Sequence, residues 1–219
     1  MRVGLIADVH ANLVALEAVL ADMPPVDRLL NAGDVVGYNP WPAEAVAAMR
    51  EREVPTVMGN HDRMVARRTN FGANRMAQAG IEHATRELDA TQREWIESLP
   101  STVTCCQGRV TVVHGHPDDP DRYTYPEEFG SHLLDDELVL VMGHTHVQHA
   151  ERYEAGIVVN PGSVGQPRDR DPRAAYAVVD LDAMTVDTHR VEYDVDRVVR
   201  AIEDAGLPER TGKRLRRGE

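Results

Sequence analysis

Five polar motifs, each placed directly after a short apolar run, constrain the fold of this chain more than any other feature. The motifs contain histidine, carboxylate or amide side chains: Asp8-Val9-His10, Gly33-Asp34, Gly59-Asn60-His61-Asp62, His114 and His144-Thr145-His146. Short apolar runs bounded by polar loops are typical of buried strands. Because the loops that follow parallel strands meet at one edge of a sheet, we expect five loops to bring these side chains together.

The order of the predicted elements indicates the fold class. Before Pro100, strands at 2–7, 27–31 and 56–58 alternate with helices at 13–23, 41–52 and 61–88, the last with a break near 70–72. After Pro100 we expect strands at 102–106, 109–114, 138–142, 147–153, 156–159, 175–181 and 185–191, then a helix at 195–205. This order predicts an α/β (α+β) fold, a four-layer α-β-β-α sandwich with two mixed sheets packed face to face and helices outside. We expect residues 1–219 to form a single domain.

Capping residues predict where two of the helices begin. Asn12 is the expected N-cap of the helix at 13–23, which ends at Pro24-Pro25. Thr91 and Glu94 have the spacing of a capping box ahead of an apolar segment that starts at Trp95.

The charge of the chain limits its partners. The formal net charge is -12, and Lys213 is the only lysine, so the positive side chains are nearly all arginine. A nucleic-acid duplex requires a basic face, so we expect no stable nucleic-acid partner. The one basic cluster is the segment 209–219, for which a solvated helix or frayed end is favoured and a phosphate-binding arm is the alternative. The sequence leaves homo-oligomer formation open.

Several features favour a cytoplasmic protein. Cys105 and Cys106 are adjacent and lack the spacing of a disulfide framework, which favours reduced thiols. The first apolar strand begins at once and is followed by Asp8, which leaves no room for a cleavable signal peptide. No apolar run approaches the length of a membrane span, so we expect no membrane partner.

The donor types in the motifs suit divalent cations. Two cations held close together need an anionic oxygen that bridges them and several neutral donors that complete each shell. Carboxylates, imidazoles and an amide supply this mixture, and oxygen and nitrogen donors suit Mn, Fe, Ni or Zn. Taken singly, Asp8 fits a loop or helix cap, and His114 fits a hydrogen-bonded histidine. Taken together, the motifs predict a site for two metal ions.

On these motifs the chain resembles the calcineurin-like metallophosphoesterase superfamily, and within it the small bacterial and archaeal phosphodiesterases. The resemblance covers nearly the whole chain and includes the run Asn160-Pro161-Gly162-Ser163 and the stretch 33–40. It implies that one metal is held by Asp8, His10, Asp34 and His146. It implies that the other is held by Asp34, Asn60, His114 and His144, so that Asp34 is the bridge.

The resemblance also implies the activity, that of a dinuclear-metal-dependent phosphoesterase acting on a small phosphoester, with a phosphodiesterase favoured. A hydroxide between the metals would attack phosphorus in line with the leaving oxygen, while His61 would stabilise the transition state or protonate the leaving group. Mn is the favoured metal, with Fe, Ni, Zn or Mg as alternatives. The alternative functions are a nuclease and a non-catalytic binding scaffold, as in the retromer subunit that lacks the catalytic histidine.

Five further residues are candidate contacts to substrate or phosphate: Asn12, Tyr38, Asn160, Ser163 and Arg168. For Tyr38 the choice is between stacking on a nucleobase and packing within its loop, and for Arg168 between a forked phosphate contact and a solvated loop. Many family members carry an aspartate where this chain has Gly37, so the group that orients His61 is open. The acidic segment 118–137 is expected to form a rim or lid.

Overall fold

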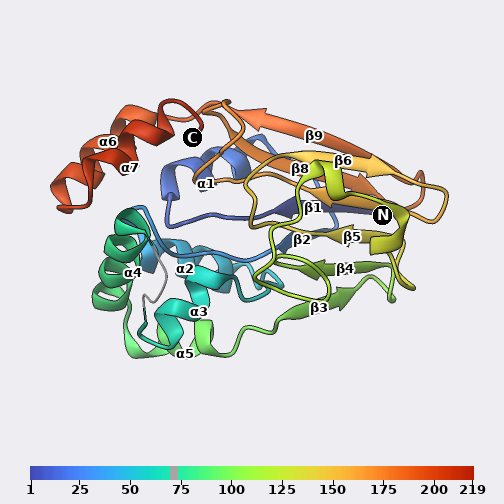
Figure 1. Ribbon diagram of the computed structural model, residues 1–219, viewed down its shortest axis with the longest axis horizontal. Helices are drawn as coiled ribbons and strands as arrows, with labels where there is room; N and C mark the ends of the chain where they lie inside the picture. The colour runs from blue at the N-terminus through green and yellow to red at the C-terminus, as the bar shows by residue number, and fades with distance from the viewer. Residues whose placement is uncertain (70–73) are drawn as a thin grey trace.

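The computed structural model describes residues 1–69 and 74–219, which form two mixed β-sheets packed face to face (Figure 1). The four-stranded sheet has the order β2-β1-β8-β9 and contains β1 (Arg2–Ile6), β2 (Arg28–Asn31), β8 (Ala174–Asp180) and β9 (Thr185–Val191). β1 runs parallel to β2 and antiparallel to β8. The carboxyl ends of β1 and β2 therefore lie at the same edge of this sheet.

The second sheet has five strands in the order β3-β4-β5-β7-β6. Its members are β3 (Thr102–Cys105), β4 (Val110–Val113), β5 (Val139–Val141), β6 (His149–Arg152) and β7 (Ile157–Asn160). The central strands β4, β5 and β7 are parallel, and the edge strands β3 and β6 are antiparallel to their neighbours. The loops that leave β4 and β5 therefore also lie at one edge.

Two apolar cores hold the layers together, and β1 contributes to both. Leu5 of β1, Val141 of β5 and Val179 of β8 are buried between the two sheets. Ile6 of β1 and Tyr176 of β8 belong to a second core beneath the helices. Successive residues of a strand face opposite sides, which is why one strand can serve both cores. Each large apolar side chain buried in this way stabilises the fold by roughly 1.5–3 kcal/mol relative to exposure.

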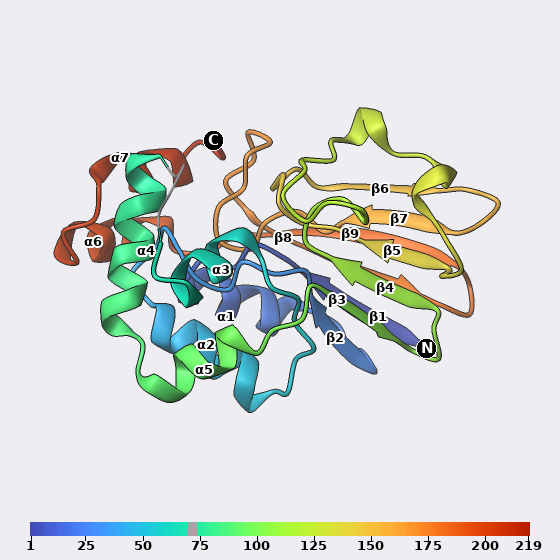
Figure 2. The same cartoon turned by 60° about the horizontal axis from the view of Figure 1, so that its bottom comes forward.

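Helices cover the outer face of the four-stranded sheet and the end of the sandwich toward which β1 and β2 run (Figure 2). They are α1 (Leu13–Asp22), α2 (Pro42–Glu51), α3 (Asn60–Ala66), α4 (Arg75–Glu87), α5 (Ala90–Glu97), α6 (Val195–Asp204) and α7 (Glu209–Leu215). The outer face of the five-stranded sheet is covered by the 3-10 helices η1 (Pro126–Glu128) and η2 (Ser131–Leu133) and their flanking residues. The predicted α/β fold class is confirmed, and its fourth layer is a thin one.

The predicted cap of α1 is confirmed, because the Asn12 side chain accepts the Ala15 N–H at 3.2 Å. The predicted cap of α5 was wrong. This helix begins one residue before Thr91, and Asp89 caps it by accepting the Gln92 N–H at 2.8 Å. A capping box is present, but Asp89 and Gln92 form it, two residues before the predicted pair.

Two other local predictions differ from the structure. The segment 56–58 makes a single parallel bridge from Thr56 to Asn31 and forms no strand. The predicted helix at 61–88 is two helices, α3 and α4, and its expected break near 70–72 lies outside the described residues. Throughout residues 1–69 and 74–219, no helix combines the length and the apolar character that crossing a membrane requires.

Candidate metal centre

The loops after β1 and β2 run side by side and are joined by backbone hydrogen bonds. The Asp8 N–H donates to the Gly33 carbonyl and the His10 N–H donates to the Asp34 carbonyl, both at 2.9 Å. These bonds continue the pairing of the two parallel strands beyond their ends. They place two of the sequence motifs next to each other.

The loops after β4 and β5 meet in the same way, and one of them reaches across to the other sheet. The Gly143 N–H donates to the His114 carbonyl at 2.8 Å. The His144 N–H donates to the Asp8 carboxylate, at 3.1 Å to Oδ2. A Cβ atom on Gly143 would lie 3.0 Å from the Cβ of Ala7, so glycine allows this close approach. The two sheet edges therefore form one site.

Five of the seven predicted metal ligands have a backbone in the left-handed region. Their φ angles are 52° for Asp8, 46° for His10, 54° for Asp34, 68° for His144 and 60° for His146. This conformation is uncommon for residues other than glycine and costs on the order of 1–3 kcal/mol each. Such strain persists where the surrounding structure enforces it, and it is concentrated at functional sites. The turns direct the carboxylate and imidazole groups inward.

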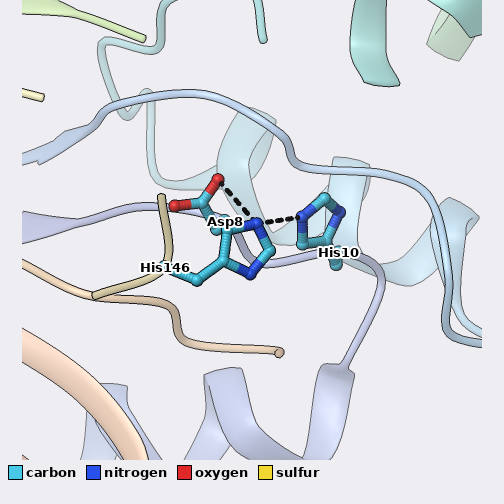
Figure 3. A group of neighbouring side chains, drawn as sticks. All are labelled: Asp8, His10 and His146. Carbon is cyan, nitrogen blue, oxygen red and sulfur yellow. Dashed lines mark hydrogen bonds and ion pairs between the residues drawn. The ribbon is translucent and has the colours of Figure 1, made fainter. Parts of the chain in front are cut away.

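Asp8, His10 and His146 form a buried cluster in which two imidazoles face each other (Figure 3). The Nδ1 of His10 lies 3.1 Å from the Val36 carbonyl and the Nδ1 of His146 lies 2.6 Å from the Gln166 carbonyl, so both Nδ1–H groups donate to backbone. Each Nε2 then carries a lone pair. These atoms lie 3.2 Å apart, and the Nε2 of His146 is 3.6 Å from the Asp8 carboxylate. Facing lone pairs repel unless a cation lies among them, so the donor set fits a divalent metal.

Asp34 lies between this cluster and a second one. Its Oδ2 is 3.6 Å from the Nε2 of His10 and 3.5 Å from the Nε2 of His114. Its Oδ1 accepts the backbone N–H of His61 at 2.8 Å, in the first turn of α3, where the helix dipole favours negative charge. One carboxylate therefore faces both groups of donors, as a bridging ligand must.

His114 repeats the arrangement of the first cluster. Its Nδ1 lies 2.7 Å from the Ala32 carbonyl, and its Nε2 lies 3.1 Å from the Oδ1 of Asn60. With Nδ1–H donating to the backbone, the Nε2 of His114 and the Oδ1 of Asn60 are the two atoms that face this second position. The geometry again fits a cation held by nitrogen and oxygen donors.

The pKa values of two buried groups, Asp8 and His114, show where positive charge is favourable in the site. Burial raises the pKa of Asp8 to about 7; His114 opposes this rise, and Asp34 adds to it. Burial also lowers the pKa of His114, but the charge and hydrogen bond of Asp34 outweigh this and raise it to about 9. Protons therefore occupy positions where extra positive charge is favourable. A divalent cation would supply that charge and compete with the protons.

The His61 ring is held by packing. Its centroid lies 4.7 Å from that of Tyr38 and 4.8 Å from that of His10. Its buried Nδ1 has no hydrogen-bond partner among the described residues. A Cβ atom on Gly37 would lie 2.4 Å from this Nδ1, so the ring fills the space that a side chain at position 37 would need. Burial lowers the pKa of His61 to about 4, so the ring is neutral near pH 7.

Asp62 does not orient His61. One of its carboxylate oxygens accepts the Val36 N–H at 3.2 Å and the other accepts the Gly59 N–H at 3.1 Å. Asp62 therefore caps α3 and ties this helix to the loop after β2. An acidic side chain in the first turn of a helix also suits the helix dipole.

His144 lies at the margin of the cluster, next to a cavity. Its ring centroid is 4.8 Å from that of His114, but its Nε2 faces the Asp121 carbonyl at 3.2 Å. The Tyr123 ring stacks on it with centroids 3.9 Å apart. The cavity has a volume of about 470 Å³, and its wall includes Tyr38, Asn60, His61, Arg63, Arg67 and Tyr123. Residues of the acidic segment 118–137 thus form part of the rim.

Three of the candidate substrate contacts lie behind the site. The Nδ2 of Asn12 donates to the Gly165 carbonyl, and the Oγ of Ser163 donates to the Asp8 carbonyl. The Nδ2 of Asn160 donates to the Gly143 carbonyl at 2.7 Å. All three side chains are buried and hydrogen-bonded within the protein. In this structure the three side chains join the loops of the site to one another.

The other two candidates border the site. Tyr38 is 3% exposed, and its ring packs against His10 and His61. Arg168 is half-buried, and its guanidinium donates to the Tyr38 hydroxyl at 3.2 Å and to the Gln166 side chain at 2.8 Å. The Nε of Arg168 is buried without a hydrogen-bond partner among the described residues.

Sequence patterns did not identify the groups that orient the imidazoles. These groups are the backbone carbonyls of Ala32, Val36 and Gln166. A carbonyl carries no residue-type signal, and Gln166 is 20 positions from His146 along the chain. Tyr123 was missed for a similar reason, because a single aromatic residue in an acidic loop does not point to a histidine ring.

Comparisons with known proteins agree with this geometry. Residues 1–184 match the family model described as the calcineurin-like phosphoesterase superfamily domain. An uncharacterised protein of Methanocaldococcus jannaschii is 29% identical over 235 residues, which covers 97% of this chain and 96% of the relative. The phosphodiesterase YfcE of Escherichia coli is 28% identical over 189 residues, 85% of this chain and 91% of the relative. A crystal structure of a metallophosphoesterase from Sphaerobacter thermophilus is 38% identical, with a TM-score of 0.88 and coverage of 100% and 99%.

Proposed function

The chain belongs to the calcineurin-like phosphoesterase superfamily, and on this premise we propose that it is a phosphodiesterase dependent on two divalent metal ions. Family membership makes it a hydrolase of phosphoric ester bonds. The name of the Escherichia coli relative, a phosphodiesterase, favours diesters among the substrates. The substrate is a small phosphoester that reaches the site through the cavity beside His144.

The observation that carries the proposal is the position of the Asp34 carboxylate. Its Oδ2 lies at nearly equal distances, 3.6 Å and 3.5 Å, from the Nε2 atoms of His10 and His114. Those two histidines belong to separate groups of donors. We therefore assign Asp8, His10 and His146 to one metal, Asn60, His114 and His144 to the other, and Asp34 to both.

The residues around this centre have distinct roles in the reaction. Two bound metal ions would supply positive charge that activates a water molecule and neutralises the phosphate. His61 lies beside the cavity with a neutral ring, where its imidazole can stabilise or protonate the leaving oxygen. The guanidinium of Arg168 can hold a phosphate oxygen, since its planar fork matches phosphate geometry. Tyr38 keeps both side chains in place, because it contacts His61 and accepts a hydrogen bond from Arg168.

The proposed metal is Mn, because all assigned donors are nitrogen or oxygen. Fe, Ni, Zn and Mg are the alternatives, because these ions also bind nitrogen or oxygen donors. Elemental analysis of protein purified without added metal, followed by reloading with each ion, would compare them directly.

The test of the proposal is hydrolysis of bis(p-nitrophenyl) phosphate by protein loaded with Mn. We expect turnover by the unmodified chain and a loss of about 10²- to 10⁴-fold in kcat for His61→Ala, the range for general acid–base groups. The variant should retain its metal content, because His61 is not assigned to either ion.

His132→Ala is the matched control, since His132 is an exposed histidine in η2, outside the cluster. It should keep both turnover and metal. Unchanged turnover in His61→Ala would refute the assignment of His61. Absence of turnover in the unmodified chain with every metal tested would instead favour the scaffold alternative, which the buried groups of carboxylates and imidazoles argue against.

A further inference from the structure

An exposed tyrosine forms part of the cavity wall beside the metal centre. Tyr123 lines the cavity together with Asn60, His61 and His144. Tyr123 is 44% exposed, whereas His144 is 5% exposed. The two rings are stacked, with centroids 3.9 Å apart and an angle of 21° between their planes. Tyr123 therefore lies on the solvent side of an assigned metal ligand, in the wall of the same cavity.

A second exposed tyrosine extends this aromatic surface. The Tyr125 ring is parallel to that of Tyr123 to within 13°, with centroids 6.0 Å apart. Among residues 1–69 and 74–219, the large apolar side chains that are exposed are those of Tyr123, Tyr125 and Leu138. Single apolar residues scattered over a surface are normal, but two stacked tyrosines in one short segment form a patch, and such a patch marks a binding surface.

The segment that carries Tyr123 is held in place on both sides. Before it, the Asp121 carboxylate forms an ion pair with Arg63 of α3, and both residues line the cavity. After it, the Glu128 carboxylate accepts the Tyr125 N–H at 3.0 Å. A surface that is fixed before a ligand arrives loses little conformational freedom on binding, which favours affinity.

The exposed ring of Tyr123 suits a planar aromatic group of the substrate. Tyr38 also lines the cavity, but it is 3% exposed and offers no comparable surface. Aromatic side chains bind nucleobases by stacking, because every base has a π-face. The cavity volume of about 470 Å³ is within the range of small-molecule sites. Since Tyr123 lies on the solvent side of His144, a spacer such as a ribose must separate the planar group from a phosphate at the metal ions.

We propose that Tyr123 is the platform on which the base of a nucleotide stacks, so that the preferred substrates of the metal centre are phosphoesters of nucleosides. The phosphate lies at the metal ions, the ribose spans the cavity, and the base lies against the Tyr123 ring. The inference rests on the proposed function, because the metal centre defines the position of the phosphate. Tyr123 selects the substrate and takes no part in the chemical step.

The test compares binding of AMP and ribose 5-phosphate to the protein loaded with Mn, measured by calorimetry. The two probes share the phosphate and the sugar and differ in the base. We expect AMP to bind about tenfold more tightly, which is within the range that one stacked base provides. Tyr123→Ala should abolish this preference, whereas Tyr123→Phe should keep it, because the ring and not the hydroxyl makes the contact. Ribose 5-phosphate should bind all three proteins equally.

Tyr125→Ala is the matched control, because Tyr125 is a tyrosine of the same segment, 45% exposed, that does not line the cavity. This variant should leave the preference for AMP unchanged. Since Tyr123 stacks on His144, each variant is also checked for metal content and by a thermal melt. If Tyr123→Ala loses metal, Tyr123→Leu replaces it, because leucine keeps an apolar side chain over His144 but has no ring to stack on.

Three results would overturn the proposal. The first is equal binding of AMP and ribose 5-phosphate by the unmodified chain, and the second is a preference for AMP that survives the loss of the Tyr123 ring. The third is loss of the preference in Tyr123→Phe, which would assign the contact to the hydroxyl and not to stacking.

The outcomes for the two proposals can be told apart. Hydrolysis of bis(p-nitrophenyl) phosphate by the unmodified chain shows whether the metal centre is active, and this compound contains no nucleoside. If it is hydrolysed but AMP binds no more tightly than ribose 5-phosphate, the base subsite is wrong and the proposed function stands. If it is not hydrolysed, the proposed function fails, and the ratio of the two affinities still decides whether Tyr123 binds a base.

Discussion

The loops of the metal centre and the β3–β4 hairpin both contain residues with positive φ, but they hold this conformation by different means. In the hairpin, Cys106 (56°), Gln107 (64°) and Gly108 (82°) form the turn, and the Gly108 N–H donates to the Cys105 carbonyl at 3.1 Å. All of these groups lie within one short segment. The turn is therefore determined locally.

In the metal centre the same backbone conformation depends on distant residues. The His10 N–H donates to the Asp34 carbonyl, and the Asp8 carboxylate accepts the N–H of His144 from the other sheet. No neighbour in the sequence makes these contacts. Strain in the hairpin only turns the chain, whereas strain in the metal centre directs the ligand side chains toward one another.

The largest effect should come from the residue on which both groups of donors depend. Asp34→Asn removes the negative charge between the Nε2 atoms of His10 and His114. We expect the loss of at least one metal ion per chain, measured by elemental analysis, and a fall in kcat/KM of at least about 100-fold. A variant with full metal content and full activity would show that Asp34 is not the bridge.

A smaller effect, on turnover, is expected at Gly37, which has a positive φ and lies against the His61 ring. Gly37→Ala puts a Cβ 2.4 Å from the Nδ1 of His61, at a φ of 102°. The ring must move, so kcat should fall by roughly 10- to 100-fold, while the metal content is kept because the ligands are untouched. Steady-state kinetics with bis(p-nitrophenyl) phosphate measure this. Equal losses in activity and bound metal would mean that the whole site had shifted.

Loss of a side chain that stabilises the ligand loops should have a smaller effect on metal binding than loss of a ligand. Ser163→Ala removes an O–H that donates to the Asp8 carbonyl at 2.7 Å and an acceptor for the Gln166 N–H at 2.7 Å. Both bonds are buried, so we expect metal affinity to weaken by about tenfold and stability to fall by about 1–3 kcal/mol. Metal titration and urea unfolding provide the two values. Unchanged metal affinity would show that the hydrogen bonds of Ser163 do not contribute to metal binding.

The hairpin supplies the matched control for Gly37. Gly108 has a φ of 82°, and nothing lies within 4 Å of the position its Cβ would take. Gly108→Ala should therefore cost about 1 kcal/mol of stability through backbone strain alone and leave kcat and metal content unchanged. Urea unfolding and the same assay would check this. Loss of activity in this variant would contradict the separation of the two regions.

The smallest effect is expected in the surface loop that holds the C-terminus, where Arg170 also has a positive φ (68°). Hydrogen bonds from Arg173 lower the pKa of Asp171 to about 2. Because this value is below the unfolded value of about 4, the stabilisation is present above about pH 4 and lost as the pH falls toward 2. The pair is partly exposed, so it contributes less than about 1 kcal/mol.

Asp171→Asn tests that pH dependence. Urea midpoints of the variant and the unmodified chain should differ slightly at pH 6 and converge as the pH falls to about 2. A difference that grew as the pH fell would give the wrong sign and rule out the Asp171 carboxylate as its source.

Much of the fold could be predicted from the sequence because apolar patterning is local. The strand predicted at 185–191 coincides with β9, the strand predicted at 56–58 is absent, and the others agree with the structure to within two residues at each end. Asn12 was recognised as a cap because its type and position suffice. The cap at Asp89 was missed because two overlapping capping boxes fit the same stretch, and packing of Trp95 and Ile96 in the core selects between them.

The candidate site was predictable in its ligand types and less so in its surroundings. Asp8, His10, Asp34, His114 and His146 come together as their motifs indicated. Asn160 and Ser163 belong to a recognisable motif, but the motif does not say whether their side chains face substrate or a neighbouring loop. Burial decides that, and it depends on the packing of segments far apart in the chain.

The sequence by itself determined which chemical groups would be available and that they would lie at strand ends. Residue type and apolar periodicity can be read from short segments of the chain. Only the tertiary structure decided where the Asp34 carboxylate lies and why position 37 is glycine. Those outcomes depend on contacts between residues separated by many positions. Their energies exist only once both sheets and the C-terminal helices have packed together.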